Sequence, residues 1–303
     1  MPTVTWKNGK AYLPKLEVHI NNTCNLTCDN CDRFSNHNFT GVQKYKDYAE
    51  TIEQWADKIS VGHCVILGGE PLLNPTILEW VDGLRQFSDS LQILTNGTRL
   101  NQVKGLYEKI QGTGNFIGIS WHNINDTSIF DEIKKFLGTN LVLDHNDEPI
   151  DQIPWPEYGN DTWIRNKEGQ IVSIHLQNEF GLAAIQQNEK GKWSLWNNDP
   201  DEVHRSCSYY QHKSYNMVHG EIFKCAPVAL ISEFDNQHSL DISNDDREIV
   251  HSYKPLKVQN FDHEAKDFFS NIDNVLPNCK FCPASWENDP RIIYPIIKNK
   301  KLA

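Results

Sequence analysis

The chain has 303 residues, of which 39% are hydrophobic and 23% charged, so it is long enough for one large α/β domain with a small appendage. No segment approaches the ~20 apolar residues of a membrane span, and the first residues lack the basic and apolar regions of a secretory signal. The formal net charge of −11 disfavours a broad phosphate-binding surface. We therefore expect a cytoplasmic protein with no membrane partner, and nucleic acid is a disfavoured partner.

The first two-thirds of the chain alternates short apolar runs with amphipathic segments. This order predicts a parallel sheet with right-handed crossovers, in which ligands bind at the carboxyl ends of the strands. The predicted strands are Leu16–Ile20, His63–Leu67, Leu91–Leu94, Phe116–Ser120 and Leu141–Leu143. The predicted helices are Tyr48–Ile59, Thr76–Phe87, Leu100–Ile110 and Ser128–Leu137.

Two further stretches carry weaker signals. Lys7-Asn-Gly-Lys10 is typical of a hairpin turn. From Pro149 to Pro200 the pattern gives way to tryptophans, prolines and polar runs, with Ile171–His175 as one more candidate strand. We interpret residues 1–200 as one domain and residues 201–303 as a small second unit with a C-terminal tail. That second unit has few periodic apolar runs, so its hydrophobic core alone would not stabilise it. A group bound by its cysteines would supply the missing stability.

Seven of the eight cysteines stand in groups, namely Cys24/Cys28/Cys31, Cys207/Cys225 and Cys279/Cys282. Cys64 stands alone in an apolar run, which indicates a buried core thiol. Grouped cysteines without a secretory signal indicate metal ligation in a reducing compartment rather than a disulfide framework.

The first group forms a C-x3-C-x2-C loop directly after the first predicted main strand. Three thiolates in one short loop suit a [4Fe–4S] cluster whose fourth iron stays open. The alternative is a zinc site of three cysteines completed by a remote residue such as His37. The pattern resembles the radical S-adenosylmethionine (SAM) superfamily, which implies a partial (β/α)6-type parallel barrel. One position departs from the family: the residue before the third cysteine is Asn30 where an aromatic is usual, and we expect Phe34 to substitute.

Further segments after successive strands support the resemblance. Gly68-Gly69-Glu70-Pro71 is similar to the family's GGEP motif, which implies a role in holding the SAM amino group. Taken alone, the same residues would be an ordinary turn with a solvated Glu70. Asn96 and Ser120, after the third strand and closing the fourth, resemble other cofactor-binding positions of the family.

The second group resembles the auxiliary-cluster module of the SPASM/twitch enzymes, in its shorter, one-cluster twitch form. Twelve residues separate Cys207 from Gly220 and four separate Gly220 from Cys225, while Cys279 and Cys282 form a C-x2-C pair. The resemblance implies an α+β module with a second, fully ligated [4Fe–4S] cluster. A structural zinc site with four cysteine ligands is the alternative.

The resemblance implies that SAM is cleaved to a 5′-deoxyadenosyl radical that abstracts a substrate hydrogen. An auxiliary cluster that accepts an electron would make the reaction a dehydrogenation or an oxidative bond formation, on a small molecule or a peptide. An external one-electron donor such as flavodoxin or ferredoxin is implied. The alternatives are a peptide epimerase, with Cys64 as hydrogen-atom donor, and a non-catalytic zinc-binding protein. His122 as a base and Arg165 as an anion clamp are the candidate catalytic residues, and an ordinary structural role is the alternative for both.

Overall fold

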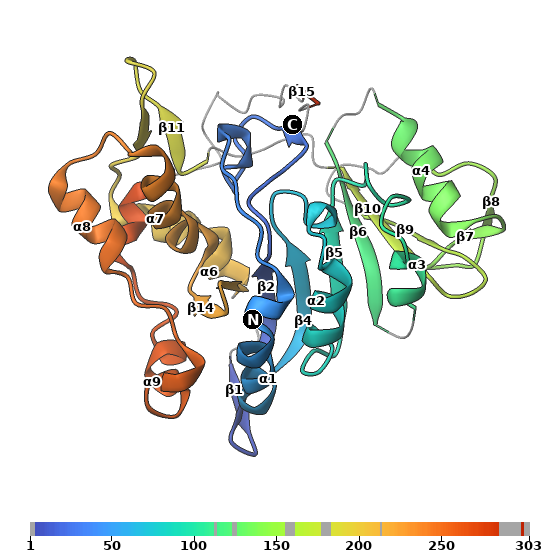
Figure 1. The fold of residues 1–303 in the computed structure, drawn as a ribbon, viewed down its shortest axis with the longest axis horizontal. Coiled ribbons are helices and arrows are strands. Elements are labelled where there is room, and N and C mark those ends of the chain that lie inside the picture. The colour runs from blue at the N-terminus through green and yellow to red at the C-terminus, as the bar shows by residue number, and fades with distance from the viewer. Residues whose placement is uncertain are drawn as a thin grey trace.

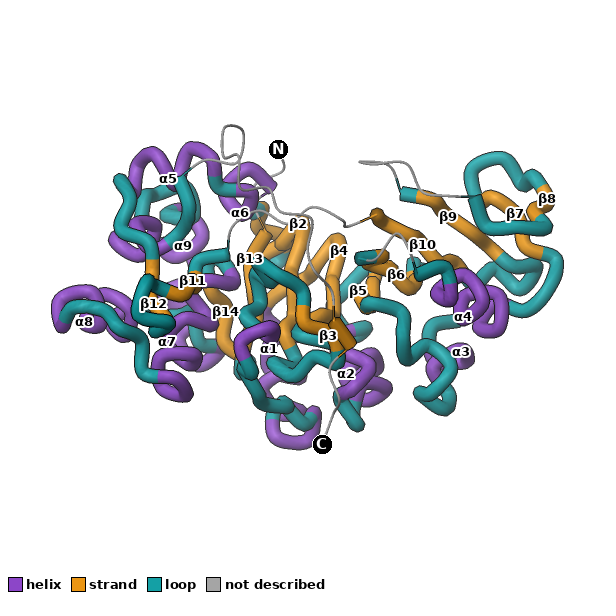
Figure 2. Tube along the Cα trace, turned by 90° about the horizontal axis from the view of Figure 1, so that it is seen from above, coloured by secondary structure: helices purple, strands orange, loops and turns teal. Residues whose placement is uncertain are grey.

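The computed structural model describes residues 4–111, 114–122, 126–154, 161–176, 183–212, 214–284 and 298–299. Its centre is a mixed sheet in which β2 (Lys10–His19), β4 (Ile59–Leu67), β5 (Leu91–Thr95), β6 (Asn115–Trp121) and β10 (Ile171–Leu176) run parallel in that order. Helices α1 (Ala49–Lys58), α2 (Ile77–Leu84) and α4 (Ser128–Leu137) cover one side of it (Figures 1 and 2). The predicted α/β fold with a parallel sheet is confirmed.

One end of the sheet differs from the prediction. Leu141–Leu143 was expected as the next parallel strand, but as β7 it pairs antiparallel with β8 (Pro149–Ile150) and β9 (Thr162–Arg165). The chain turns back within a few residues through Asp147, whose φ is +58°. A turn this tight leaves no room for a crossover helix. The strand beside β6 is therefore β10, to which β9 is antiparallel.

The sheet continues at its other end into the second predicted unit. β13 (Ser214–Val218) pairs parallel with β2, and β14 (Glu221–Phe223) pairs antiparallel with β13. The remaining helices of this part lie beside that end of the sheet (Figure 1). They are α5 (Pro200–Ser206), α6 (Ser208–His212), α7 (Ala226–His238), α8 (Asn244–Ser252) and α9 (Phe261–Ser270). There α7 and α8 contribute to a second hydrophobic cluster, and α9 packs on the main core.

Shorter elements complete the fold. The predicted hairpin turn joins β1 (Thr5–Lys7) to β2. The helix expected over Leu100–Ile110 is reduced to α3 (Leu106–Lys109), because Gly105 before it has a φ of +84°, outside the helical region. Two small two-stranded sheets pair β11 (Ile185–Gln187) with β12 (Trp193–Leu195) and β3 (Leu26–Thr27) with β15 (Lys298–Asn299). Among the described residues, 3-10 turns span Ser35–His37, Tyr45–Asp47, Pro71–Leu73, Val258–Asn260 and Pro277–Phe281.

The two faces of the parallel sheet have opposite character. Val18, Ile66 and Ile93 lie in one row and belong to the main hydrophobic core, which includes side chains of α1, α2 and α4. Glu17 and Gln92 lie in the neighbouring row, and successive strand residues point to opposite sides. We call the side away from α1, α2 and α4 the inner face. Glu17 and Gln92 give this face polar groups that the helix-covered core lacks.

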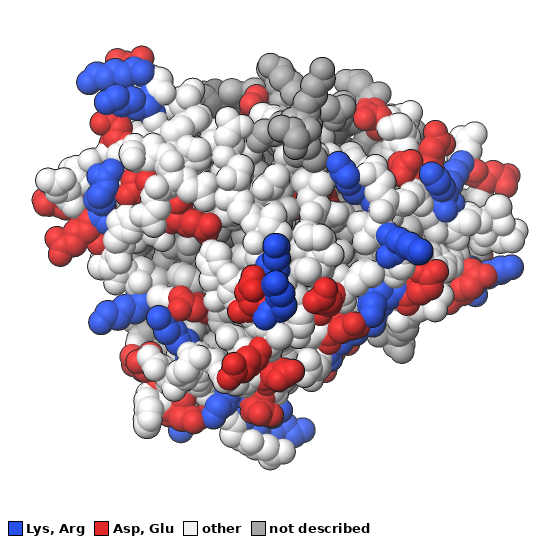
Figure 3. Space-filling view, viewed as in Figure 1, with Lys and Arg blue, Asp and Glu red and all other residues white. Residues whose placement is uncertain are grey.

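The molecular surface agrees with the overall charge. Lysines and arginines are interspersed with aspartates and glutamates on the face drawn in Figure 3. Within the described ranges, every helix is too short or too polar to cross a bilayer.

Candidate active site

The first three cysteines lie in the loop that follows β2, at the carboxyl edge of the parallel strands. Cys24 and Cys28 are each 8% exposed, Cys31 is half-buried, and all three are free thiols. Burial raises the pKa of Cys28, and the neighbouring Cys31 and Cys24 raise it further. The three sulfurs are thus close enough to interact electrostatically, as ligands of one cluster must be.

Gly68 and Gly69 let the turn after β4 pack directly on the cysteine loop. A Cβ on Gly68 would lie 2.3 Å from the carbonyl oxygen of Asn21, and one on Gly69 would lie 2.5 Å from that of Thr23. The Glu70 amide donates to the Thr23 carbonyl at 3.0 Å. These two glycines therefore fix the position of the loop that carries the thiols, because any side chain would push the two segments apart.

Glu70 is fully buried, so the solvated alternative is wrong. Its carboxylate accepts hydrogen bonds from the Leu72 amide at 2.9 Å, the Thr95 hydroxyl at 2.7 Å and the Asn96 amide at 2.9 Å. Burial raises the pKa of Glu70, against the effect of these donors. The Glu70 side chain thus links the turn after β4 to the end of β5 and holds these two segments together.

Asn96 connects the turn after β5 to the cysteine loop. Its amide group donates to the Asn25 side chain at 3.0 Å and approaches the Cys24 sulfur at 3.9 Å. The Leu26 amide also donates to that sulfur, at 3.4 Å. Burial raises the pKa of Cys24 to about 12, with nearby Glu70 contributing, while these donors favour the thiolate. N–H groups aimed at sulfur suit a thiolate ligand of an iron–sulfur cluster.

Two side chains expected to serve the first cysteine site pack against the second hydrophobic cluster instead. His37, the fourth ligand of the zinc alternative, packs against Trp193 with ring centroids 4.2 Å apart, and burial lowers its pKa to about 4. Phe34 is fully buried against Phe234 of α7, so it does not supply the missing aromatic contact. Within the described ranges, no three His, Cys, Asp or Glu side chains form a preformed site for one metal ion.

The second group of cysteines is assembled from three separate segments. Cys207 ends α5, Cys225 precedes α7, and Cys279 and Cys282 lie in and just after the last 3-10 turn. Burial raises the pKa of Cys282, and the other three thiols raise it further, so all four interact. Asn198 ties the segments together, since its amide donates to the Lys280 carbonyl at 3.0 Å and its side chain to the Cys282 carbonyl at 2.9 Å.

Lys224 brings a positive charge to these four thiols. It is 7% exposed, and its ammonium group donates to the Asn274 carbonyl and lies 3.4 Å from the His204 ring. Burial lowers the pKa of Lys224, whereas Cys279, Cys225 and Cys207 act to raise it. A buried cation beside four thiols favours their ionised form.

A buried polar network on the inner face joins the two cysteine groups. Arg33, two residues after Cys31, donates to Glu17 of β2 at 2.7 Å and to Asn216 of β13 at 3.0 Å. Tyr209, two residues after Cys207, interacts electrostatically with Arg33. The Arg33 guanidinium lowers the pKa of Glu17 against the effect of burial. The network thus ties the loop after Cys31 to β2 and β13.

Comparison with known proteins finds a family to which the region of the first group is similar. The model of the radical SAM superfamily matches residues 18–144. This part of the chain is therefore similar to radical SAM superfamily domains. A protein of Methanocaldococcus jannaschii named "Probable GTP 3′,8-cyclase" is 27% identical over 138 residues, which are 45% of this chain and 45% of that protein.

Solved structures show more distant similarity. SuiB of Streptococcus suis bound to S-adenosylmethionine is 20% identical, with a TM-score of 0.34 over 42% of this chain and 31% of SuiB. SuiB bound to its precursor peptide SuiA is 21% identical, with a TM-score of 0.34 over 41% and 30%. Each match spans less than half of the relative's length. The first cysteine group and the Gly68–Pro71 turn lie inside the residues that the family model matches, and the second cysteine group lies outside them.

The other predicted site residues of the first two-thirds of the chain are spread more widely. Ser120 lies near the carboxyl end of β6, in register with His175 of β10, and His122 follows directly. Arg165 is in register with Ile171, the first residue of β10, so it lies at the opposite edge of the sheet. There it forms ion pairs with Asp144, at 3.0 Å, and with Asp147. The structure does not bring Arg165 together with the cysteine loop.

Cys64 is fully buried in register with Leu16 and Leu91, on the helix-covered side of the sheet. The hypothesis that it donates a hydrogen atom into the inner face is therefore wrong, and the core-thiol interpretation is correct. Its neighbour His63 points to the inner face, where it lies 3.1 Å from the Gln92 side chain.

Sequence reasoning missed Glu17, Arg33, Asn216 and Lys224. The alternation in Leu16-Glu-Val-His-Ile20 is a signal for Glu17, since a polar residue recurs at every second position of a strand. The other three have no local signal, because their significance arises from contacts between distant segments.

Proposed function

We propose that this chain is a radical SAM oxidoreductase in which Cys24, Cys28 and Cys31 hold one [4Fe–4S] cluster and Cys207, Cys225, Cys279 and Cys282 hold a second. The observation that supports this is that the free cysteines of each group interact with one another, the first in one loop and the second across three segments. When bound, the first cluster and SAM supply the one-electron cleavage that forms a 5′-deoxyadenosyl radical.

The residues around the first group position its ligands. Gly68 and Gly69 allow the close approach of the two loops, and Glu70 fixes the end of β5. Asn96 directs an N–H group at the Cys24 sulfur. Ser120 and His122 are proposed to contact SAM and substrate respectively, because they stand at the same edge of the sheet.

The inner face is proposed to receive the substrate. His63 and Gln92, which are half-buried there, give it hydrogen-bonding groups of both kinds. A small polar molecule or a peptide fits this chemistry. A positive charge from Lys224 beside the second cysteine group favours an added electron there, which supports a net oxidation of the substrate.

The proposal is tested by anaerobic reconstitution with iron and sulfide, followed by SAM and dithionite. We expect brown protein with roughly eight irons, and formation of 5′-deoxyadenosine and methionine in equal amounts. Colourless protein that retains two zinc ions after anaerobic purification and forms no 5′-deoxyadenosine would instead establish the zinc-binding alternative.

A further inference from the structure

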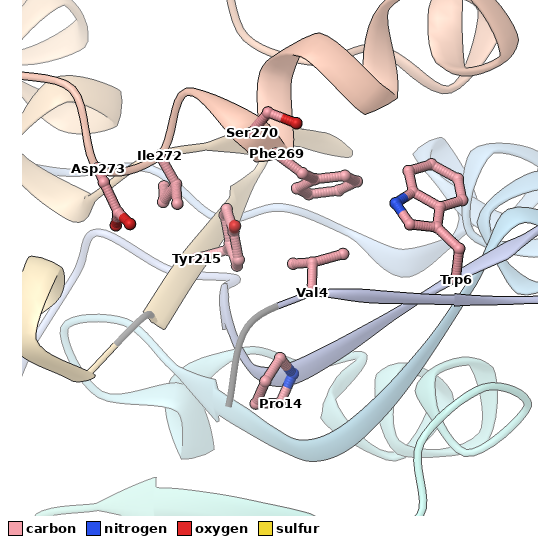
Figure 4. A pocket seen from close by; sticks show the side chains of 8 residues that line it. All are labelled: Val4, Trp6, Pro14, Tyr215, Phe269, Ser270, Ile272 and Asp273. Carbon is pink, nitrogen blue, oxygen red and sulfur yellow. The ribbon is translucent and has the colours of Figure 1, made fainter. Parts of the chain in front are cut away.

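A pocket of about 220 Å³ lies apart from both cysteine groups (Figure 4). Its walls come from the N-terminal hairpin, from β13 and from the end of α9 with the turn that follows. They are Val4, Trp6, Pro14, Tyr215, Phe269, Ser270, Ile272 and Asp273. Tyr215 is in register with Leu16, so it points away from the inner face. A molecule in this pocket would therefore not occupy the proposed active site.

Three aromatic rings form much of the pocket wall. The Tyr215 and Phe269 rings meet edge to face, with centroids 5.2 Å apart, and the Trp6 and Phe269 centroids lie 6.3 Å apart. Trp6 is 41% exposed, which is unusual for so large an apolar ring. Its ring already has the Lys266 ammonium group 6.0 Å from its centroid. Aromatic faces carry negative potential and attract such cations.

Tyr215 contributes a polar group to this apolar wall. The residue is 1% exposed and lines the pocket. Its hydroxyl oxygen can accept a hydrogen bond from a pocket ligand. Figure 4 shows Tyr215 between Asp273 at one end of the pocket and Trp6 at the other.

The Asp273 carboxylate sets the charge preference of the pocket. It acts on Tyr215, whose pKa is raised by burial and then by this negative charge, and it also attracts Lys224. A carboxylate accepts several hydrogen bonds at once. Carboxylate, phenol oxygen and aromatic faces together favour a donor with positive charge and disfavour an anion.

We propose that this pocket binds a primary ammonium group on a short alkyl chain. The volume is below that of pockets for drug-sized ligands, so it fits one small amine or one lysine-like side chain. The ammonium group donates to Tyr215 and Asp273, and the alkyl chain lies against the rings of Phe269 and Trp6. This site does not depend on the function proposed above.

Isothermal titration of the full chain with n-butylammonium and with 1-butanol tests the proposal, since the two probes share size and differ in charge. We expect only butylammonium to bind, and Tyr215→Phe and Asp273→Asn each to weaken it about tenfold. Asp245→Asn, an exposed substitution on α8, is the control and leaves the affinity unchanged. Thermal unfolding of each variant shows that it is folded.

The source of the ammonium group is resolved with N-acetyl-lysine methylamide and its norleucine analogue. Selective binding of the lysine derivative, as tight as that of butylammonium, supports a side chain of a peptide as the natural ligand, and weaker binding supports a free amine. Equal affinity for butylammonium and butanol, absence of butylammonium binding, or binding that both pocket substitutions leave intact would overturn the proposal.

Discussion

The two cysteine groups are assembled from the chain in different ways. Cys24, Cys28 and Cys31 come from one loop, and that loop is held by backbone contacts to the neighbouring Gly68–Glu70 turn. The second group comes from segments up to 75 residues apart, tied by the side chains of Asn198 and Lys224. The first group is therefore built locally, whereas the second exists only when the C-terminal part is folded.

Single cysteine substitutions give the largest contrast between the groups. Cys28→Ala is expected to abolish SAM cleavage, because the open iron needs all three ligands, while the second group retains roughly four irons. Cys282→Ala is expected to lower iron content equally but to leave substrate-independent SAM cleavage in place. Iron analysis and 5′-deoxyadenosine formation measure both. Equal loss of SAM cleavage in the two variants would contradict the separation of roles.

Gly69→Ala tests the local construction of the first group. The added methyl would lie 2.5 Å from the Thr23 carbonyl, so we expect the cysteine loop to shift and the protein to lose about 2–3 kcal/mol of unfolding free energy. SAM cleavage falls at least tenfold, and the iron of the second group stays. Gly169→Ala is the control, since space around that residue is open and only its φ of +84° opposes the change. Chemical denaturation of both variants gives the comparison.

Lys224→Met tests the electrostatics of the second group. Removing a buried positive charge near four thiolates is expected to lower the reduction potential of that cluster by roughly 50 mV or more, with the first cluster unchanged. Lys224→Arg, which keeps the charge, shifts it less, and exposed Lys254→Met is the control. Redox titration followed by electron paramagnetic resonance measures the potentials. An unchanged potential in Lys224→Met, with the second cluster present, would refute this role.

Cys64→Ala gives the smallest effect on chemistry. We expect SAM cleavage to be unchanged and the unfolding free energy to fall by about 1–3 kcal/mol through the cavity left in the core.

Burial of Cys64 also predicts that the unfolding free energy depends on pH. Burial raises the pKa of Cys64 to about 12 from an ordinary value of 9.0. The unfolded thiol ionises first as the pH rises, so the wild-type protein loses stability between about pH 9 and 12, and the part due to Cys64 disappears in the variant. Denaturation of the metal-free forms across this range gives the measurement. Identical pH dependence in both would show that Cys64 is not buried.

The local character of the first group explains why the sequence predicts it well. Its three ligands, the Gly68–Pro71 turn and Asn96 follow successive strands of a parallel sheet, and the periodicity of the chain predicts those strands. The antiparallel hairpin that begins at β7 escaped prediction, because three apolar residues look alike in a parallel or an antiparallel strand. Arg33 and Lys224 escaped because their partners lie on other segments, and burial of a charge has no signature in local sequence.

The central claim is that the two cysteine groups hold separate iron–sulfur clusters, of which one binds SAM. Electron paramagnetic resonance of the dithionite-reduced triple variant Cys24→Ala/Cys28→Ala/Cys31→Ala, with and without SAM, tests it most directly. We predict a remaining iron–sulfur signal from roughly four irons that SAM does not alter, whereas the wild-type spectrum changes on SAM addition. A triple variant without any iron–sulfur signal, or one whose remaining signal responds to SAM, would contradict the account.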